Sequence, residues 1–309
     1  MKSSVTEEPI FVSVIVPVYN DTKRLALCLE ALQSQRNKRF DLKYEVIVID
    51  NNSTEDVKNV CVQYHVQYLH EKKQGSYAAR NKGIREAKGK YLAFTDSDCI
   101  PDPYWLENGI KRLMDNPNIG LVGGKIQVFA TKNKKTLGDI FDLAFAFPQH
   151  HYVHENHFAA TANMLTTKNT FNKVGLFNPN MASGGDFEWG QKVFKFGLEL
   201  LYAPEAIVRH PSRNSIKAII SKSYRVNRNY NSKYYPSLPS SKQLFKYIYE
   251  LIAVYIPLSQ AYRKLRSANP NLKISFYQRV QLFFLLFSIH YVKTFSKITE
   301  WIKLRVKKL

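Results

Sequence analysis

The chain of 309 residues is long enough for one large hydrophobic core, or for a core with a smaller appended domain. Its composition, with 45% hydrophobic and 23% charged residues, is that of a folded protein and excludes wholesale disorder. Three widely spaced cysteines exclude a disulfide framework and a four-cysteine zinc site. The cysteine usage, and polar N-terminal residues that lack the apolar run of a secretory signal, favour a cytoplasmic location.

The net charge of +20 is concentrated near the C-terminus. From Pro211 onward the chain has 19 of its 45 Lys and Arg residues, but only two of its 25 acids, Glu250 and Glu300. The preceding residues are nearly neutral. Such a basic tail suits a phosphate-rich partner, either nucleic acid or an anionic membrane surface, and charge alone does not choose between them.

In the first hundred residues, short β-branched runs alternate with helical patterns. Strands are expected at 11–18, 44–49, 66–69 and 90–95, and helices at 22–35, from Ser53 onward and at 75–88. This alternation predicts an α/β fold whose sheet is parallel, with right-handed crossovers.

The next hundred residues are less regular. Strands are expected at 119–129, 158–166, 198–202 and 206–208, and helices at 168–174 and 186–196. The segment 131–157, which is rich in His and aromatic residues, is expected to be irregular or partly helical.

Polar residues follow three of the first strands at their carboxyl ends. Asn20 follows the first strand, Asp50 ends the second, and Asp96-Ser-Asp98 follows the fourth. Ligands bind beyond the carboxyl ends of parallel strands, so these side chains should gather at one sheet edge. Two carboxylates one residue apart suit Mg²⁺ or Mn²⁺ bound together with a diphosphate. Such a pair is also common in loops, but the buried strand before it and Asp50 nearby favour the functional interpretation.

Four segments resemble, in order and spacing, the successive motifs of glycosyltransferase family 2. They are Val14-Ile-Val-Pro-Val-Tyr-Asn20, Val48-Ile-Asp-Asn-Asn-Ser-Thr54, Gly75-Ser-Tyr-Ala-Ala-Arg-Asn-Lys-Gly83 and Phe94-Thr-Asp-Ser-Asp98. The resemblance covers roughly residues 12–210. It implies a GT-A fold, in which a mostly parallel nucleotide-binding sheet is flanked by helices. The catalytic domain would span 10–211, with a donor-binding half at 10–115 and an acceptor half at 116–211.

The resemblance also implies roles for individual residues. Those expected to bind the nucleotide sugar are Pro17, Tyr19, Asn20, Asp50, Arg80, Asn81 and Asp96. Asp98 would ligate Mn²⁺ or Mg²⁺ directly. His210 would complete the metal site, because several GT-A enzymes have a histidine near this place. A hydrogen-bonded histidine that closes the sheet is the alternative.

Inverting transfer needs a base that removes the proton of the acceptor hydroxyl. Asp186, at the start of a predicted helix, aligns with the base of the family. The family often has Glu-Asp here, whereas this chain has Gly185-Asp186, and the departure leaves Glu188 as an alternative base. The structural alternative for Asp186 is a helix cap, a position that Asp favours.

Two residues are candidates for contacts with the acceptor. His154 belongs to a histidine-rich stretch that lacks cysteine partners for zinc, so an acceptor-side loop is favoured over a metal site. Asn163, in a strand-like run, is expected to face the same space. A structural amide is the alternative for Asn163.

The segment 212–309 is predicted to be a basic amphipathic helical extension. Its apolar stretches, 244–258 and 280–292, are interrupted or too short to span a bilayer, which needs about 20 residues. Basic flanks with aromatic residues on the other side suit helices that lie in the headgroup plane at the inner face of the cell membrane. The alternative is a helical extension packed on the catalytic domain.

These observations favour an inverting, metal-dependent enzyme that moves one sugar from a nucleotide-diphosphate sugar, UDP-linked for preference, to a lipid-linked or polysaccharide acceptor. The chain lacks the Gln-x-x-Arg-Trp motif of processive family members, which favours a non-processive, bacterial-type member. A nucleotidyltransferase is the alternative enzyme, although no Gly-rich basic turn follows the first strand. A nucleic-acid- or membrane-binding scaffold with an inactive transferase domain is the alternative of another class.

Overall fold

The computed structural model describes residues 10–234, 245, 248–249, 255–268 and 272–306. The chain packs as two compact units. We call Met1–Gln127 with Phe147–His210 the sheet unit, and Val128–Ala146 with Pro211–Leu309 the helical unit. The domain division expected from the sequence, 10–211 and 212–309, stays a prediction.

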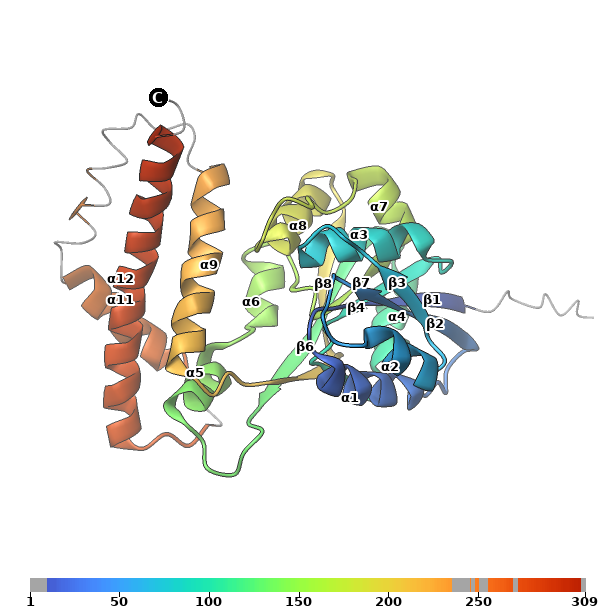
Figure 1. Ribbon diagram of the computed structural model, residues 1–309, viewed down its shortest axis with the longest axis horizontal. Helices are drawn as coiled ribbons and strands as arrows, with labels where there is room; N and C mark the ends of the chain where they lie inside the picture. Colours follow the sequence, from blue (N-terminus) through green and yellow to red (C-terminus); the bar gives the residue numbers. More distant parts are fainter. Residues whose placement is uncertain (1–9, 235–244, 246–247, 250–254, 269–271, 307–309) are drawn as a thin grey trace, which may run out of the picture. The chain divides into compact units, whose positions relative to one another are not determined.

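The first four strands of the sheet unit run parallel (Figure 1). They are β1 (Ile10–Val18), β2 (Leu42–Asp50), β3 (Gln67–His70) and β4 (Tyr91–Thr95). Between them along the chain lie α1 (Thr22–Gln33), α2 (Val57–Gln63) and α3 (Ser76–Glu86). β1 lies between β2 and β4, and β2 pairs with β3. The predicted alternation of strands and helices is confirmed here.

The other half of the sheet is joined by antiparallel pairs of β4 with β7, β6 with β7 and β5 with β8. Its strands are β5 (Ile100–Pro101), β6 (Ile119–Phe129), β7 (Asn163–Thr167) and β8 (Glu199–Pro211). The helices along this part of the sheet unit are α4 (Trp105–Asp115), α6 (Gln149–His154), α7 (Lys168–Val174) and α8 (Gly185–Lys195). The complete order is β3-β2-β1-β4-β7-β6-β8-β5.

Two strand predictions need correction. The strand expected at 158–166 begins only at Asn163, because a turn precedes it in which the Asn163 N–H donates to the Ala160 carbonyl. The stretches expected as separate strands at 198–202 and 206–208 form one continuous strand, β8.

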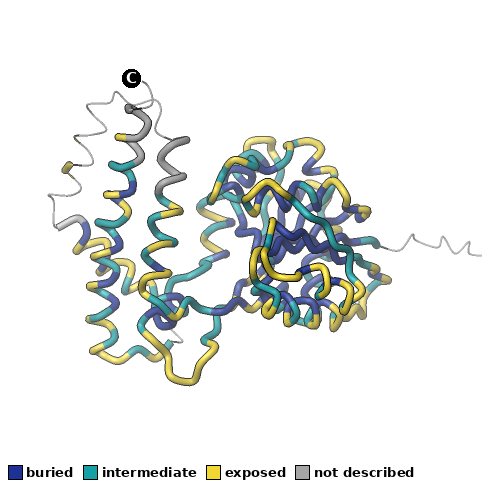
Figure 2. Tube along the Cα trace, viewed as in Figure 1, coloured by how far each residue is buried: buried dark blue, intermediate teal, exposed yellow. Residues whose placement is uncertain are grey.

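The sheet is buried on both faces, as the β-branched runs predicted. Val14 and Val16 pack on one side with Leu25 of α1, while Ile15 packs on the other side with Ile84 of α3. Val14, Ile15 and Val16 are fully buried, and Figure 2 shows the sheet as mostly buried chain. Each such aliphatic side chain contributes roughly 1.5–3 kcal/mol relative to leaving it exposed. The two apolar clusters therefore fix the sheet between its helices.

Helix α2 begins later than the sequence suggested. Its N-cap is Asp56, whose carboxylate accepts the N–H of Asn59, so Ser53 does not cap it. The Ser53 hydroxyl accepts the N–H of Asn20 in the neighbouring loop instead. The polar residues after β2 therefore serve to join two loops.

The helical unit contains α5 (Leu137–Phe145), α9 (Ile216–Tyr234), α11 (Tyr255–Arg266) and α12 (Phe276–Val306). Its described core is a small cluster of Ile219, Leu285 and Ile289, against which Leu137 and Phe141 pack. Two buried acids of α5 hold the chain that follows β8. Asp139 accepts the Ser212 hydroxyl at 2.6 Å, and Asp142 accepts Arg213 Nη1 at 3.0 Å.

Only one of the two apolar stretches of the predicted extension lies wholly within the described residues. Residues 280–292 lie inside α12, and most of 244–254 lies outside the described residues. Among the described helices, none is long and apolar enough to cross a membrane.

Candidate functional site

Strand register aligns the predicted polar residues along one sheet edge. β1 pairs with β2 so that Val18 lies opposite Asp50, and β4 runs parallel on the other side of β1. Asn20 follows the end of β1, and Asp96 follows the end of β4. The carboxyl ends of these three strands therefore carry their polar groups at the same edge, where ligands of open α/β sheets bind.

Asp50 is buried and held by hydrogen bonds. Its carboxylate accepts the Ser53 N–H at 2.9 Å and the Tyr68 hydroxyl at 3.1 Å. Burial and the neighbouring Asp50 carboxylate raise the pKa of Tyr68 to about 12, so the phenol stays a donor. An ionised carboxylate has about four acceptor positions, so Asp50 retains capacity for a ligand N–H.

The loop after β1 is equally fixed. Asn20 adopts a left-handed backbone with φ of 49°, which Asn tolerates better than most residues. Its Oδ1 accepts the Thr54 N–H at 2.8 Å. Pro17 is buried in β1, whereas Tyr19 is 55% exposed at its end. Tyr19 therefore offers an aromatic face to a ligand.

Asn51 organises this edge, and sequence reasoning missed it. Its Oδ1 accepts the Gly75 N–H at 2.7 Å, and its Nδ2 donates to the Glu71 and Lys73 carbonyls. These bonds fix the loop that leads into α3. The signal in the sequence was its place beside Asp50, inside the motif-like segment 48–54.

Arg80 is buried and pairs with Asp96. Its Nη2 donates to Asp96 Oδ1, and its Nε has no hydrogen-bond partner among the described residues. Asn81, the next residue, uses both polar atoms on the main chain of Phe177: Nδ2 donates to the carbonyl, and Oδ1 accepts the N–H. Arg80 thus reaches the sheet edge through Asp96, while Asn81 anchors the chain near Phe177.

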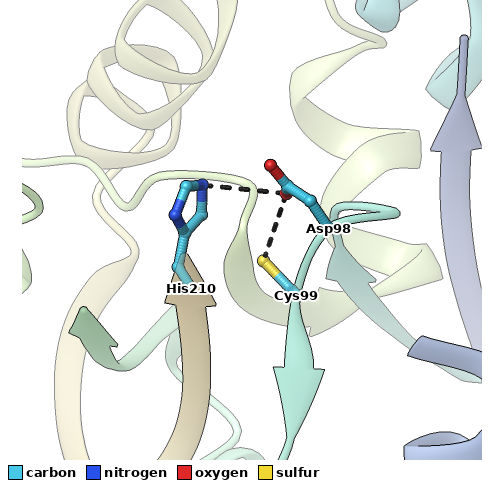
Figure 3. A group of neighbouring side chains, drawn as sticks. All are labelled: Asp98, Cys99 and His210. Atoms are coloured by element: carbon cyan, nitrogen blue, oxygen red, sulfur yellow. Dashed lines mark hydrogen bonds and ion pairs between the residues drawn. The ribbon is translucent and has the colours of Figure 1, made fainter. Parts of the chain in front are cut away.

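Asp98, Cys99 and His210 form a cluster that two distant segments bring together (Figure 3). β5 pairs with β8 so that Ile100 lies opposite Arg209. The next residues in this register are Cys99 and His210, which explains why His210 reaches Asp98. In the described part of the chain, this is the one group of three His, Cys, Asp or Glu ligand atoms within 4.8 Å of one another.

The cluster fits a divalent cation. Asp98 Oδ1 lies 3.7 Å from His210 Nε2, a separation that an ion with bonds of about 2.1 Å to each atom can bridge. Carboxylate oxygen and imidazole nitrogen are both ligands for Mn²⁺. Burial raises the pKa of Asp98, and Asp96 raises it further, while His210 and Arg24 oppose the shift. A cation at this carboxylate would offset the cost of burying its charge.

Arg24 and Asp21 also belong to this region, although the sequence did not single them out. Arg24 Nε donates to Asp21 Oδ1 at 2.8 Å, and its Nη1 lies 3.4 Å from Asp98 Oδ2. The i,i+3 spacing of Asp21 and Arg24 at the start of α1 was the available signal.

The thiol of Cys99 is a poor ligand for a hard cation. Burial raises the pKa of Cys99 well above its usual value, and the Asp96 and Asp98 carboxylates raise it further. The neutral thiol points its Sγ at Asp98 Oδ1, 3.9 Å away. The buried position of Cys99 favours a packing role.

The two candidate bases differ in their surroundings. Asp186, partly exposed in the first turn of α8, accepts the Tyr77 hydroxyl at 3.0 Å and the Phe187 N–H at 2.9 Å, and burial raises its pKa. Glu188 is buried and lies 3.3 Å from Lys192 on the same helix. A raised pKa suits a general base, which favours Asp186.

The two acceptor candidates also differ. His154 is exposed on α6 and stacks on His150, with ring centroids 4.4 Å apart. Asn163 is fully buried: Oδ1 accepts Trp105 Nε1–H, and Nδ2 donates to the carbonyls of Lys125 and Ala206. All its hydrogen-bonding groups are used within the protein, so the acceptor role predicted for Asn163 does not fit this position, and the structural amide does.

Comparison with known sequences gives consistent matches. The profile of the family described as Glycosyl transferase family 2 matches residues 13–178. The chain is 34% identical over 224 residues to glycosyltransferase AglE of Haloferax volcanii, covering 71% of this chain and 72% of that protein. It is 25% identical over 229 residues to the dolichyl N-acetyl-alpha-D-glucosaminyl phosphate 3-beta-D-2,3-diacetamido-2,3-dideoxy-beta-D-glucuronosyltransferase of Methanococcus voltae, covering 68% of this chain and 70% of that protein.

Comparison with solved structures confirms the GT-A fold. The mannosyltransferase PcManGT from Pyrobaculum calidifontis, in complex with GDP-Man and Mn²⁺, matches with a TM-score of 0.63 at 17% identity, over 94% of this chain and 88% of that chain. TarS from S. aureus matches with a TM-score of 0.50 at 16% identity, over 71% and 39%. At such identities the likeness shows the fold alone.

We expect Asn163→Ala to destabilise the protein by about 3 kcal/mol or more. The substitution removes the partner of two buried groups and one partly buried group, and each unsatisfied buried group costs roughly 1–3 kcal/mol. Urea unfolding followed by tryptophan fluorescence measures the loss. His154→Ala is the control and should change the stability by less than about 0.5 kcal/mol, because the residue is exposed. Equal stability of the two variants would contradict a structural role for Asn163.

Proposed function

Because the chain belongs to glycosyl transferase family 2 and is a glycosyltransferase, we propose that it moves a single sugar, with inversion, from a nucleotide-diphosphate sugar to a lipid-linked acceptor. A polysaccharide acceptor is the second possibility. The observation that carries the proposal is the Asp98 and His210 pair at the sheet edge that also holds Asp50 and Asp96. This edge combines a place for a cation with acids that can orient a nucleotide.

The nucleotide would lie against the loops after β1 and β2. The Asp50 carboxylate would accept the N–H of the base, which suits the imide of uracil and therefore UDP. Tyr19 would stack on the base and Pro17 would shape the turn, while Asn20 and Asn81 keep the surrounding loops in place. Asp96, held by Arg80, would accept hydroxyl groups of the ribose.

Asp98 and His210 would hold Mn²⁺ or Mg²⁺ between them. Such a cation, when bound, neutralises charge on the diphosphate leaving group. Arg24 adds a positive charge that is 3.4 Å from Asp98 and half-exposed. The cluster would thus stabilise the charge that develops as the sugar leaves.

Asp186 would act as the base. The acceptor hydroxyl oxygen forms a bond to the anomeric carbon as the bond from that carbon to the diphosphate oxygen breaks. The hydroxyl proton passes to the Asp186 carboxylate, and the bonding electrons leave with the diphosphate. Glu188 serves less well, because Lys192 lies beside its carboxylate.

A lipid-linked acceptor is supported by the Methanococcus voltae relative, whose name describes transfer to a dolichyl phosphate-linked sugar. His154, exposed on α6, would contact the acceptor sugar.

The helical unit would bind the acceptor's membrane surface, at the inner face of the cell membrane. On α12, large apolar side chains recur at helical spacing and form one exposed stripe. We call it the α12 stripe; its members are Tyr277, Val280, Phe284, Phe295 and Ile302. An open apolar pocket of about 660 Å³ lies beside it, lined by Ile220, Ser221, Tyr224, Tyr291, Val292 and Phe295.

The helical unit also holds most of the excess positive charge of the chain. Lys264 of α11 lies near Lys293 of α12, and both side chains are exposed. A strongly basic unit that also presents an exposed apolar stripe suits an anionic lipid surface, where each nearby Lys or Arg adds roughly 1 kcal/mol of attraction.

A panel of UDP- and GDP-linked sugars, each with and without Mn²⁺, tests the donor proposal by thermal shift. One donor should raise the melting temperature, and more so with Mn²⁺, since a ligand stabilises the state that it binds. Asp98→Ala should abolish the Mn²⁺-dependent part and reduce donor hydrolysis by at least about 100-fold, and His210→Ala should weaken both. Asp102→Ala is the control, because its carboxylate pairs with Arg209 outside the cluster. Full activity of Asp98→Ala would contradict the proposal.

Flotation with liposomes that contain anionic phosphatidylglycerol tests the membrane proposal. The double substitution Phe284→Ser and Phe295→Ser should weaken binding at least tenfold, because each phenyl group removed from water contributes roughly 1.5–3 kcal/mol. Phe196→Ser, which replaces a similarly exposed phenylalanine of the sheet unit, should float like the wild type. If the double variant floats unchanged, or if the protein binds RNA with a steep salt dependence and ignores liposomes, the surface has another partner.

A further inference from the structure

Tyr77 lies beneath the candidate base. It stands in the first turn of α3 and is 5% exposed. Its hydroxyl lies 3.0 Å from Asp186 Oδ1, across 109 residues of sequence. Burial and the Asp186 carboxylate raise the pKa of Tyr77, so the phenol keeps its proton and donates it.

Both hydrogen bonds that the described residues make to Asp186 go to the same oxygen. Phe187 N–H donates to Oδ1 at 2.9 Å, and the Tyr77 hydroxyl donates to that same atom. The carboxylate is therefore fixed in rotation, and Oδ2 is the oxygen that remains for an acceptor hydroxyl. A base must be aimed as well as ionised, because misplacement of a reacting group by about 1 Å can cost 100-fold in rate.

The ring of Tyr77 is itself held on several sides. It packs on Phe177 with ring centroids 5.6 Å apart, and the Arg80 guanidinium lies 5.6 Å from its centroid. Gly185 lies against it so closely that a Cβ there would stand 2.8 Å from ring carbons. No side chain fits at 185 while this ring is in place. The replacement of the usual Glu-Asp by Gly185-Asp186 thus has a steric counterpart in Tyr77.

We propose that Tyr77 is a positioning residue for the base Asp186: its hydroxyl orients the carboxylate through Oδ1, and its ring occupies the space that a side chain at position 185 would take. This inference rests on the proposed function, in which Asp186 is the base. It adds the residue that aims the carboxylate and a reason for the glycine beside it.

Several neighbouring groups set the pKa of Asp186. Burial raises the pKa of Asp186, while the Phe187 N–H, the Tyr77 hydroxyl and the Arg80 charge lower it. The other titratable groups nearby are Tyr152 of α6 and the Glu188 and Lys192 pair of α8. Burial, and then the Asp186 charge, raise the pKa of Tyr152. Removing the Tyr77 hydroxyl takes away one of the contacts that favour the ionised carboxylate. The Asp186 pKa must then rise.

Tyr77→Phe keeps the ring and removes only the hydroxyl. With the UDP- or GDP-sugar that the wild type hydrolyses fastest, kcat at neutral pH should fall about tenfold, a fraction of the roughly 10²–10⁴-fold that a general base contributes. KM for the donor should change less than about twofold. The acidic limb of the kcat profile should move to higher pH, so that part of the rate returns in alkaline buffer.

Tyr44→Phe is the matched control. It removes a hydroxyl that donates to the Leu32 carbonyl at 2.7 Å, a hydrogen bond between β2 and α1. It should leave kcat and its pH profile unchanged. A fall in kcat for Tyr77→Phe with an unmoved acidic limb, or no fall at all, would overturn the proposal.

Unfolding supplies a test that needs no substrate. Because Tyr77 stabilises ionised Asp186, its contribution should be present above the Asp186 pKa and be lost as pH falls through it. Tyr77→Phe should therefore lower the melting temperature more at pH 8 than at pH 4, and this difference should vanish in an Asp186→Asn background. A loss independent of pH and of residue 186 would show a merely structural hydroxyl and overturn the proposal.

A double-mutant comparison tests whether the Tyr77 ring occupies the space beside Gly185. Gly185→Ala should lower the melting temperature strongly in the wild type and much less in a Tyr77→Ala background, and equal losses would overturn the steric part. Asp186→Asn and Tyr77→Phe test the base and its positioning residue independently. An active Asp186→Asn variant would remove the base from the proposed function, whereas an inactive Asp186→Asn with a fully active Tyr77→Phe would reject only the role of Tyr77.

Discussion

The guanidinium of Arg80 is buried in the sheet unit, and a charge so placed persists only when partners compensate it. Asp96 accepts from it on one side, and the ring of Tyr77 lies against it on the other. Tyr77 in turn donates to Asp186. Asp96 at the sheet edge and the candidate base Asp186 are thus connected through the guanidinium of Arg80 and the ring of Tyr77, both carried by α3. The position of this helix sets both ends of the site.

Few side chains make up the sheet edge around Asp98. Asp21, Asp96 and Asp98 place three carboxylates in a small region, and Arg24 and His210 are the positive or potentially positive groups beside Asp98. Burial and mutual repulsion hold the pKa of Asp98 above its usual range, so the region gains by taking up a cation. Backbone hydrogen bonds meanwhile fix the neighbouring loops. The edge is therefore organised before a ligand arrives, which reduces the cost of ordering it.

The excess positive charge and the proposed catalytic acids lie in different units of the chain. The residues before Pro211 are nearly neutral, and most of the excess positive charge lies in the helical unit. The same unit presents the α12 stripe, whereas the acids proposed for catalysis all lie in the sheet unit. Transfer from a soluble donor to a lipid-linked acceptor, as we propose for this chain, would use both kinds of surface. Separating them lets each be shaped by its own partner.

The sequence by itself determined the first four strands, their parallel arrangement, and the placing of Asp50 and Asp98 at strand ends. Short buried strands and their polar ends are local patterns, and local patterns are readable without coordinates. Only the tertiary structure decided that Asn163 is a core amide, that the β5–β8 register brings His210 to Asp98, and that the Tyr77 hydroxyl donates to Asp186. Each depends on side chains from elements far apart in the chain, whose contacts follow from how the elements pack and leave no periodic trace in either segment.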